Sequence, residues 1–216
     1  MTDPANARDL FKTAYEHRYT WDSNFPGYSA DLQIEQGSET YNGHISIKPD
    51  FTVEVSGFSD EKVQESVYTQ MRDVVTHRKR SSFENSHGKN SFSLGDTDDT
   101  GAMEILVSGD AMGSNYKIRG REICQVRRVM GRMAFVINTH QSIDTGSGYV
   151  ASRYDAVFRN PQTNEILREV QFEDDYEKFG DYYLMTNQVV RSREQGQETT
   201  TKFNFSNVKL LQPAVV

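Results

Sequence analysis

The alternation of apolar and polar residues over most of the chain is the sequence feature that most restricts its fold. From Tyr28 to Ile34 the apolar residues fall at every second position, and this period of two returns in many later segments. A strand with one buried and one solvated face shows this pattern, because successive side chains point to opposite sides of a sheet. The predicted strands lie at residues 28–34, 45–47, 51–55, 92–94, 104–107, 116–126, 133–137, 149–158, 166–172, 182–184 and 199–205.

Two other segments show the periodicity of amphipathic helices. The first begins at Asp3 and Pro4, a favourable helix start, and carries an apolar stripe of Ala7, Leu10, Phe11, Ala14 and Tyr15. The second begins at residues 59–61, ends in the basic residues 78–80, and carries a stripe of Val63, Val67, Met71, Val74 and Val75. Acidic residues at its start and basic residues at its end suit the helix dipole.

These elements predict the fold class and the number of domains. Most of the strands follow one another without helices between them, which favours antiparallel pairing over parallel βαβ units. Because the mean hydropathy is only -0.71, the core must depend on the 12 Phe and 11 Tyr, whose side chains bury much area. We therefore expect an α+β protein that forms a single domain over residues 1–216. Its long curved antiparallel sheet should be a half-open barrel with two main amphipathic helices.

Composition limits the classes of partner and the compartment. The net charge of -7 opposes binding to nucleic acid, which depends on neutralising phosphates. A single cysteine, Cys124, allows no intrachain disulfide and fits a reducing compartment. The N-terminal residues 1–10 contain no apolar run typical of a signal peptide, and no segment has the length of a membrane span. We expect a cytoplasmic protein that is either free or peripheral to a membrane.

No motif in the sequence predicts catalysis, a metal site or a cofactor. Residues 146–151 match a loose dinucleotide-binding pattern, but a strand follows them, so a hairpin turn is the better interpretation. Asp96, Asp98 and Thr100 resemble half of a calcium loop, yet Val107 stands where a bidentate Glu is needed. The five histidines are scattered, and Cys124 lies in a strand pattern typical of a structural thiol. An enzyme stays an alternative, since catalytic groups can converge from distant strands.

The segment 17–28 is a candidate for the mouth of a ligand cleft. It places the only Trp beside two Tyr and a Phe where the first helix gives way to the first strand. Such a cluster either plugs the end of the sheet or lines a cleft. Arg18, Tyr19, Trp21 and Phe25 are the candidate ligand-binding residues of this segment.

A basic strip at residues 117–132 is a second candidate. It contains one acid, Glu122, and six basic residues, Lys117, Arg119, Arg121, Arg127, Arg128 and Arg132. In an acidic protein this excess suits an acidic protein partner or an anionic membrane surface. The alternative is a solvated sheet face on which these residues pair with Asp and Glu of neighbouring strands.

Several motifs resemble an uncharacterised family from cyanobacteria, domain of unknown function 3386. The motifs are residues 18–22, residues 25–31, Gly148-Tyr149-Val150 and Asp181-Tyr182-Tyr183-Leu184, and the likeness extends over residues 10–190. The resemblance implies a photosynthetic bacterial source and identifies no catalytic residue. Tyr149 and Tyr182 of these motifs complete the set of predicted ligand-binding residues.

More distantly, the order of elements is similar to that of periplasmic lipoprotein carriers, whose half-open barrel holds acyl chains in its concave face. Because the pattern is rich in strands, the aromatic residues Tyr19, Trp21 and Phe25 gather at one junction and no catalytic motif is present, our leading hypothesis is a non-enzymatic binding protein. It should have an apolar cleft for a lipid, a pigment or another hydrophobic ligand. An interaction or assembly factor that docks through residues 117–132 is the alternative. The sequence does not fix the oligomeric state.

Overall fold

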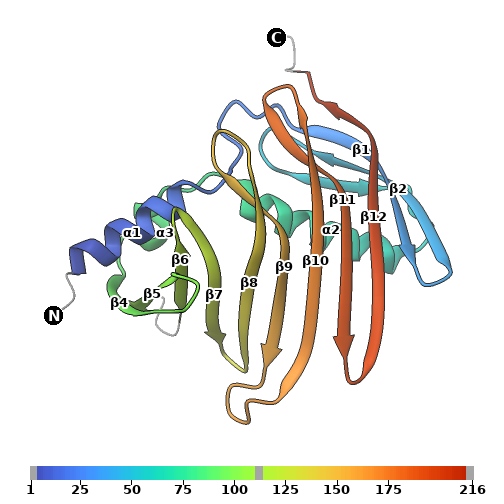
Figure 1. Ribbon diagram of the computed structural model, residues 1–216. Coiled ribbons are helices and arrows are strands. Elements are labelled where there is room, and N and C mark those ends of the chain that lie inside the picture. The colour runs from blue at the N-terminus through green and yellow to red at the C-terminus, as the bar shows by residue number, and fades with distance from the viewer. Residues whose placement is uncertain (1–3, 110–113, 213–216) are drawn as a thin grey trace. The chain divides into compact units, whose positions relative to one another are not determined.

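Within its described residues, the chain folds into three helices and one sheet of 12 strands, arranged as in Figure 1. The computed structural model describes residues 4–109 and 114–212. The strand order is β3-β2-β1-β12-β11-β10-β9-β8-β7-β6-β5-β4, so most neighbours in space are also neighbours along the chain. Within this described part, no helix is long and apolar enough to cross a membrane.

The helices are α1 (Pro4–Glu16), α2 (Glu61–Arg78) and α3 (Phe83–His87). The strands are β1 (Tyr28–Gln36), β2 (Glu39–Ile47), β3 (Val53–Ser56), β4 (Ser91–Thr97), β5 (Met103–Ser108), β6 (Asn115–Arg119), β7 (Glu122–Met130), β8 (Met133–Asp144), β9 (Tyr149–Arg159), β10 (Ile166–Phe179), β11 (Tyr182–Glu194) and β12 (Gln197–Leu210).

The predicted fold class is confirmed. The protein is α+β, its sheet is long and antiparallel, and its strand order ends at β3 and β4, as a half-open barrel requires. Both amphipathic helices are present, and Asp60 caps α2 by accepting hydrogen bonds from Lys62 N and Val63 N. Asp3, the predicted start of the first helix, lies outside the described residues.

The described residues form two compact units. Unit 1 consists of residues 4–19, 81–109, 114–172 and 192–198, and unit 2 of residues 20–80, 173–191 and 199–212. The expectation of a single domain over residues 1–216 stays a prediction.

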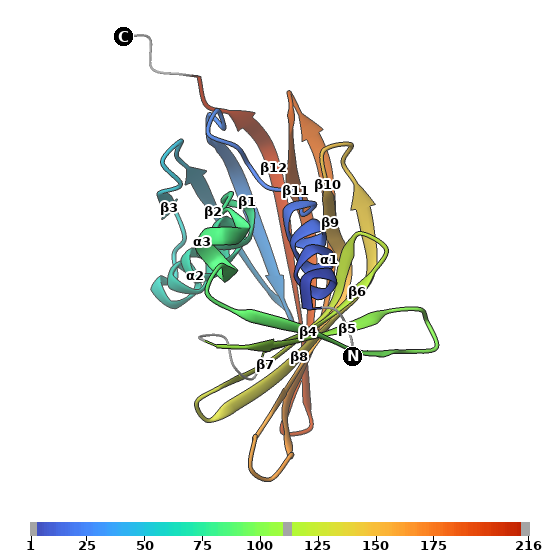
Figure 2. The ribbon, with the colours of Figure 1, turned by 90° about the vertical axis from the view of Figure 1, so that its left-hand side faces the viewer.

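The core of unit 1 lies between α1 and the strands beside it in Figures 1 and 2. α1 packs on β4, β6 and β7, and Phe11 is fully buried at its centre. The Phe11 ring lies 4.4 Å from the ring centroid of Tyr116 and 5.3 Å from that of Phe92. The core therefore depends on aromatic side chains, as the composition predicts.

Unit 2 is stabilised by a stack of aromatic rings and by α2. The rings of Trp21 and Phe25 are parallel with centroids 4.2 Å apart, and Phe51 stacks on Phe25 at 5.9 Å. α2 contacts β3 and buries Val67 and Met71, which belong to its predicted apolar stripe. Aromatic and aliphatic packing of this kind accounts for the ordered junction between α1 and β1.

The structure corrects two details of the predicted elements. Residues 116–126, predicted as one strand, are divided into β6 and β7 by a turn in which Gly120 has a φ of 64°. Residues 83–87, predicted as irregular or strand-like, form α3, whose N-cap Ser82 accepts a hydrogen bond from Asn85 N. The interpretation of residues 146–151 as a hairpin turn is confirmed, because the chain turns between β8 and β9 and Thr145 N donates to the Gly148 carbonyl oxygen.

Candidate functional site

One face of β7, β8 and β9 in unit 1 combines an arginine with apolar side chains. Arg128 pairs with Phe135, which pairs with Phe158. Directly paired residues of neighbouring strands share a face of the sheet, so these three side chains form one row across it. The next row on the same face consists of Val126, Ile137 and Ala156.

This face is not packed as tightly as the core. Phe135, Ile137 and Phe158 are half-buried, whereas the core residues below α1 are fully or almost fully buried. Tyr154, which follows the same alternation along β9, stacks on Phe172 of β10 with ring centroids 4.6 Å apart. Aromatic surface is therefore partly accessible on β8 to β10.

Arg128 is unusual because its guanidinium is only partly satisfied. Its Nη2 donates a hydrogen bond of 2.9 Å to the hydroxyl of Tyr116. Its Nε is buried and has no hydrogen-bond partner among the described residues. Buried polar atoms almost always have a partner, so this orphaned donor on a charged group is an exception to the usual pairing.

Arg18 is a second guanidinium that, like Arg128, acts on His87. Burial, Arg128 and Arg18, in that order of importance, lower the pKa of His87 to about 4. The Arg18 guanidinium lies 3.7 Å from the ring centroid of Tyr15, and its Nε donates to the Tyr15 carbonyl oxygen. No ion pair between a carboxylate and either guanidinium is found in the part of the chain that the structure describes.

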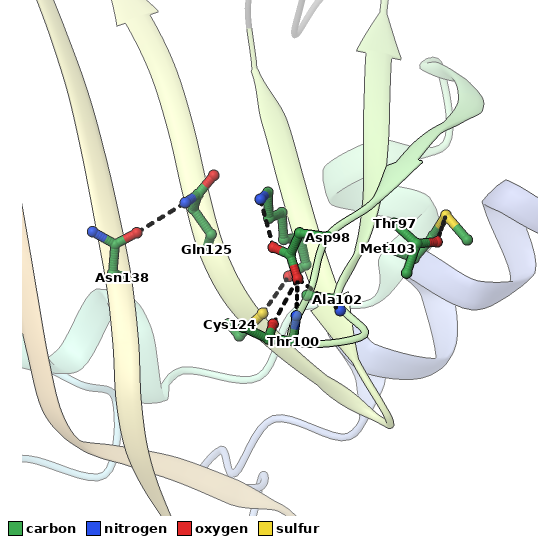
Figure 3. Close-up of polar contacts among 9 residues, drawn as sticks. Thr97, Asp98, Thr100, Ala102, Met103, Cys124, Gln125 and Asn138 are labelled. Carbon is green, nitrogen blue, oxygen red and sulfur yellow. Dashed lines mark hydrogen bonds and ion pairs between the residues drawn. The ribbon is translucent and has the colours of Figure 1, made fainter.

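The opposite face of the same strands carries a row of polar side chains. Gln125 Nε2 donates to Asn138 Oδ1 at 2.9 Å (Figure 3), and Asn138 Nδ2 donates to Asp155 Oδ1 at 2.9 Å. His140 contacts the second oxygen of Asp155. Arg127, the neighbour of Arg128, points to this opposite face, where it pairs with Val136, and Val136 pairs with Val157. This face therefore combines a polar row with apolar side chains, whereas the aromatic row of Phe135 and Phe158 lies on the face of Arg128.

Three of the predicted ligand-binding residues, Arg18, Tyr19 and Tyr149, meet in unit 1. Tyr19 N donates to the Tyr149 carbonyl oxygen at 2.7 Å, and Arg18 forms a bridge with Tyr149. The Tyr149 hydroxyl accepts a hydrogen bond from Ile123 N, and burial raises its pKa to about 12. Tyr149 thus anchors the chain after α1 to the start of β9.

The other three, Trp21, Phe25 and Tyr182, lie in unit 2. Trp21 and Phe25 are each 2% exposed, and the Tyr182 ring packs edge-on against Phe25 at 5.1 Å. The Tyr182 hydroxyl donates to Asp22 Oδ1 at 3.0 Å. The packing matches the plug interpretation of this segment, and a role of these residues in ligand binding stays a prediction.

The basic strip does not form one surface. Lys117 pairs with Asp98 at 2.6 Å, Arg119 lies opposite Glu122, and Arg121 is in the turn between β6 and β7. Arg127 and Arg128 point to opposite faces of β7, and Arg132 is exposed in the turn between β7 and β8. A role of this strip in partner binding stays a prediction.

In the calcium-like turn, hydrogen-bond donors of the protein itself already occupy the carboxylate of Asp98. Asp98 Oδ1 accepts hydrogen bonds from Thr100 N, Thr100 Oγ1 and Ala102 N (Figure 3), while its second oxygen pairs with Lys117. The hydrogen bonds from Lys117 and Thr100 hold the pKa of Asp98 well below its usual range. Within the described residues, no group of three or more His, Cys, Asp or Glu residues has the arrangement of a metal site.

Cys124 is half-buried, and its thiol donates to the Lys117 carbonyl oxygen at 3.4 Å. Burial raises the pKa of the thiol, which disfavours the thiolate that nucleophilic catalysis needs. The geometry agrees with a structural role for this residue.

Comparison with known proteins decides the family. The model of the family described as "Protein of unknown function (DUF3386)" matches residues 2–211. The chain belongs to this family. No curated protein matches the DUF3386 chain significantly.

Some solved structures resemble the DUF3386 chain at low sequence identity. A crystal structure of a domain from Vibrio parahaemolyticus, described as an outer membrane lipoprotein-sorting protein, has 10% identity and a TM-score of 0.38, with 99% of this chain and 95% of that chain covered. The complex of MucA and MucB from Pseudomonas aeruginosa has 10% identity and a TM-score of 0.24, with 96% and 100% covered. Nothing about the ligand of this chain follows from likeness at this level.

The predicted candidates included Arg128 but missed the apolar residues beside it. Phe135, Phe158 and Phe172 lie in segments whose period of two marks them as strands. The pattern within each strand does not say which residues of neighbouring strands are paired. The row of Arg128, Phe135 and Phe158 is therefore visible only in the register of the sheet.

Proposed function

We propose that this DUF3386 protein is a non-enzymatic binding protein for an anionic amphiphile, a hydrophobic molecule with a carboxylate or phosphate head. The observation that carries the proposal is the buried Nε of Arg128, which lacks a protein partner on an otherwise apolar face. A carboxylate or phosphate offers a guanidinium two acceptor oxygens in matching geometry.

The surroundings of Arg128 support an anionic head group. Arg18 adds a second guanidinium near His87, and the His87 imidazole is neutral at ordinary pH because its pKa is about 4. No acidic side chain forms an ion pair with Arg18 or Arg128 among the described residues. An anion bound there would lie near two positive charges. It would not have to displace a carboxylate that is already paired with them.

The row beside Arg128 supports an apolar tail. Phe135 and Phe158 follow Arg128 directly across β8 and β9, and both keep part of their surface accessible. Covering this surface with an acyl chain or a similar tail would remove apolar area from water, at roughly 25 cal/mol per Å².

A fluorescent fatty acid tests the proposal against its neutral methyl ester. We expect cis-parinaric acid to bind the wild-type protein more tightly than its ester, because only the acid pairs with Arg128. Arg128→Met should weaken binding of the acid by about ten-fold or more, since hydrogen bonds to charged groups contribute about 1.5–3 kcal/mol, and leave the ester unchanged. The measurement is a fluorescence titration of both probes.

Arg127→Met is the matched control, because it removes the same charge from the opposite face of β7. It should leave the preference for the acid unchanged. Urea unfolding of Arg128→Met should show a stability within about 1 kcal/mol of wild type, because the lost bond to Tyr116 is offset by removal of the orphaned donor. Equal binding of the acid to wild type and Arg128→Met, or no binding of either probe, contradicts the proposal.

A further inference from the structure

Exposed apolar side chains gather on two hairpins of unit 1. Seven large apolar side chains are exposed among the described residues, and two of them, Tyr68 and Leu106, lie elsewhere. The other five are Val129 (49% exposed), Met130 (63%), Met133 (44%), Ile166 (45%) and Leu167 (39%). Single exposed apolar residues are ordinary, but a cluster of five indicates an interaction surface.

The two hairpins lie side by side at one end of the strands. Ala134, next to Met133, pairs directly with Arg159, next to the turn that leads into β10. In an antiparallel sheet, the turns after β7 and after β9 are at the same end, as Figure 1 shows. We call residues 127–134 and 158–168, without Arg128 and Phe158, the tip patch.

The tip patch is basic in an acidic protein. It contains four arginines and one glutamate, whereas the whole chain has a net charge of -7. Arg127 and Arg132 are exposed. The next hairpin of the sheet, residues 192–198, contains one arginine and two glutamates, so the positive excess is confined to the tip patch.

The apolar side chains project from both sides of the first hairpin. Met130 and Met133 are paired and share one face, while Val129 is paired with Ala134 on the other face. A flat protein surface can cover one of these faces at a time. A fluid apolar layer covers both when the hairpin inserts into it.

We propose that the tip patch docks on an anionic lipid bilayer, with the two hairpins inserted at the level of the head groups and the arginines bound to lipid phosphates. Insertion buries the exposed Met, Val, Ile and Leu side chains, and each basic residue near an anionic surface adds to the affinity. This docking concerns a different surface from the site at Arg128 and does not depend on it.

Vesicle co-sedimentation tests the docking with defined lipids. Wild-type protein should bind vesicles of phosphatidylcholine mixed with phosphatidylglycerol, and should not bind phosphatidylcholine alone. The double variant Arg127→Gln and Arg132→Gln should lose affinity by about five-fold for each charge removed, and high salt should reduce binding in the same way. Met130→Gln with Met133→Gln should weaken binding because it removes the inserted apolar area.

Two control variants separate the tip patch from charge and hydrophobicity in general. Lys62→Gln removes one exposed positive charge from α2, and Leu106→Gln removes one exposed apolar side chain from β5. Both should bind anionic vesicles as wild type does. Circular dichroism of every variant checks that the fold is retained.

A tryptophan placed at the tip reports insertion directly. Trp21 is the only tryptophan and is 2% exposed, so its emission should be the same with and without vesicles. In Met130→Trp, the new side chain should shift its emission to the blue when anionic vesicles are added. Absence of vesicle binding overturns the proposal. Vesicle binding that the tip variants retain also overturns it. The same holds if the tip variants alter only self-association or binding to an acidic protein.

Discussion

At the scale of single residues, His87 makes the stability of unit 1 depend on pH. Its imidazole is 8% exposed, lies 4.9 Å from the ring centroid of Tyr15, and has a pKa lowered from 6.5 to about 4. Because the unfolded chain binds the proton more readily, the stability contributed by neutral His87 is fully present above pH 6.5. It is lost as the pH falls from 6.5 toward 4, by about 3 kcal/mol in total.

Urea unfolding at several pH values measures this loss. His87→Phe removes the titrating group and retains an aromatic ring, so its stability should change much less between pH 6.5 and pH 4. The carboxylates contribute the same pH dependence of stability to both proteins in this range. The difference between the two curves of stability against pH therefore isolates the contribution of His87. Parallel curves for wild type and His87→Phe would contradict the assignment.

At the scale of elements, Phe11 lies at the centre of the core between α1 and the sheet. Phe11 is fully buried and contacts the rings of Phe83, Phe92 and Tyr116. Phe11→Ala should reduce the free energy of unfolding by about 3–5 kcal/mol, because it leaves a cavity and removes apolar contacts. Thr13→Ala, an exposed position two residues later, should change it by less than about 0.5 kcal/mol in urea unfolding.

Local sequence patterns predict much of the fold but little of the site. Local signals predict α1, α2 and β1. These signals are the capping residues and apolar stripes of the two helices and the period of two in the strand. The division between β6 and β7 depends on the conformation of Gly120, and α3 is too short to show a stripe. Arg127 and Arg128 are adjacent arginines, and only the pairing of Arg128 with Phe135 shows which one faces the apolar side.

At the scale of the whole molecule, charge and apolar surface are distributed unevenly. The chain is acidic, with a net charge of -7, yet Arg18 and Arg128 lie near His87, and four arginines lie in the tip patch. We infer that the first group recognises the head of an amphiphile and that the second recognises a bilayer containing anionic lipid. A cytoplasmic protein peripheral to a membrane is the setting that we propose for both.

Native mass spectrometry of the protein, purified gently from its own host, would show whether the chain holds an anionic amphiphile. We expect wild-type protein to carry the added mass of such a molecule, released on partial unfolding, and Arg128→Met purified in the same way to carry far less. The Arg127→Met protein should retain the added mass, because its side chain points to the opposite face of β7. Bare wild-type protein, or equal amounts of bound amphiphile on wild type and Arg128→Met, would contradict the proposed function.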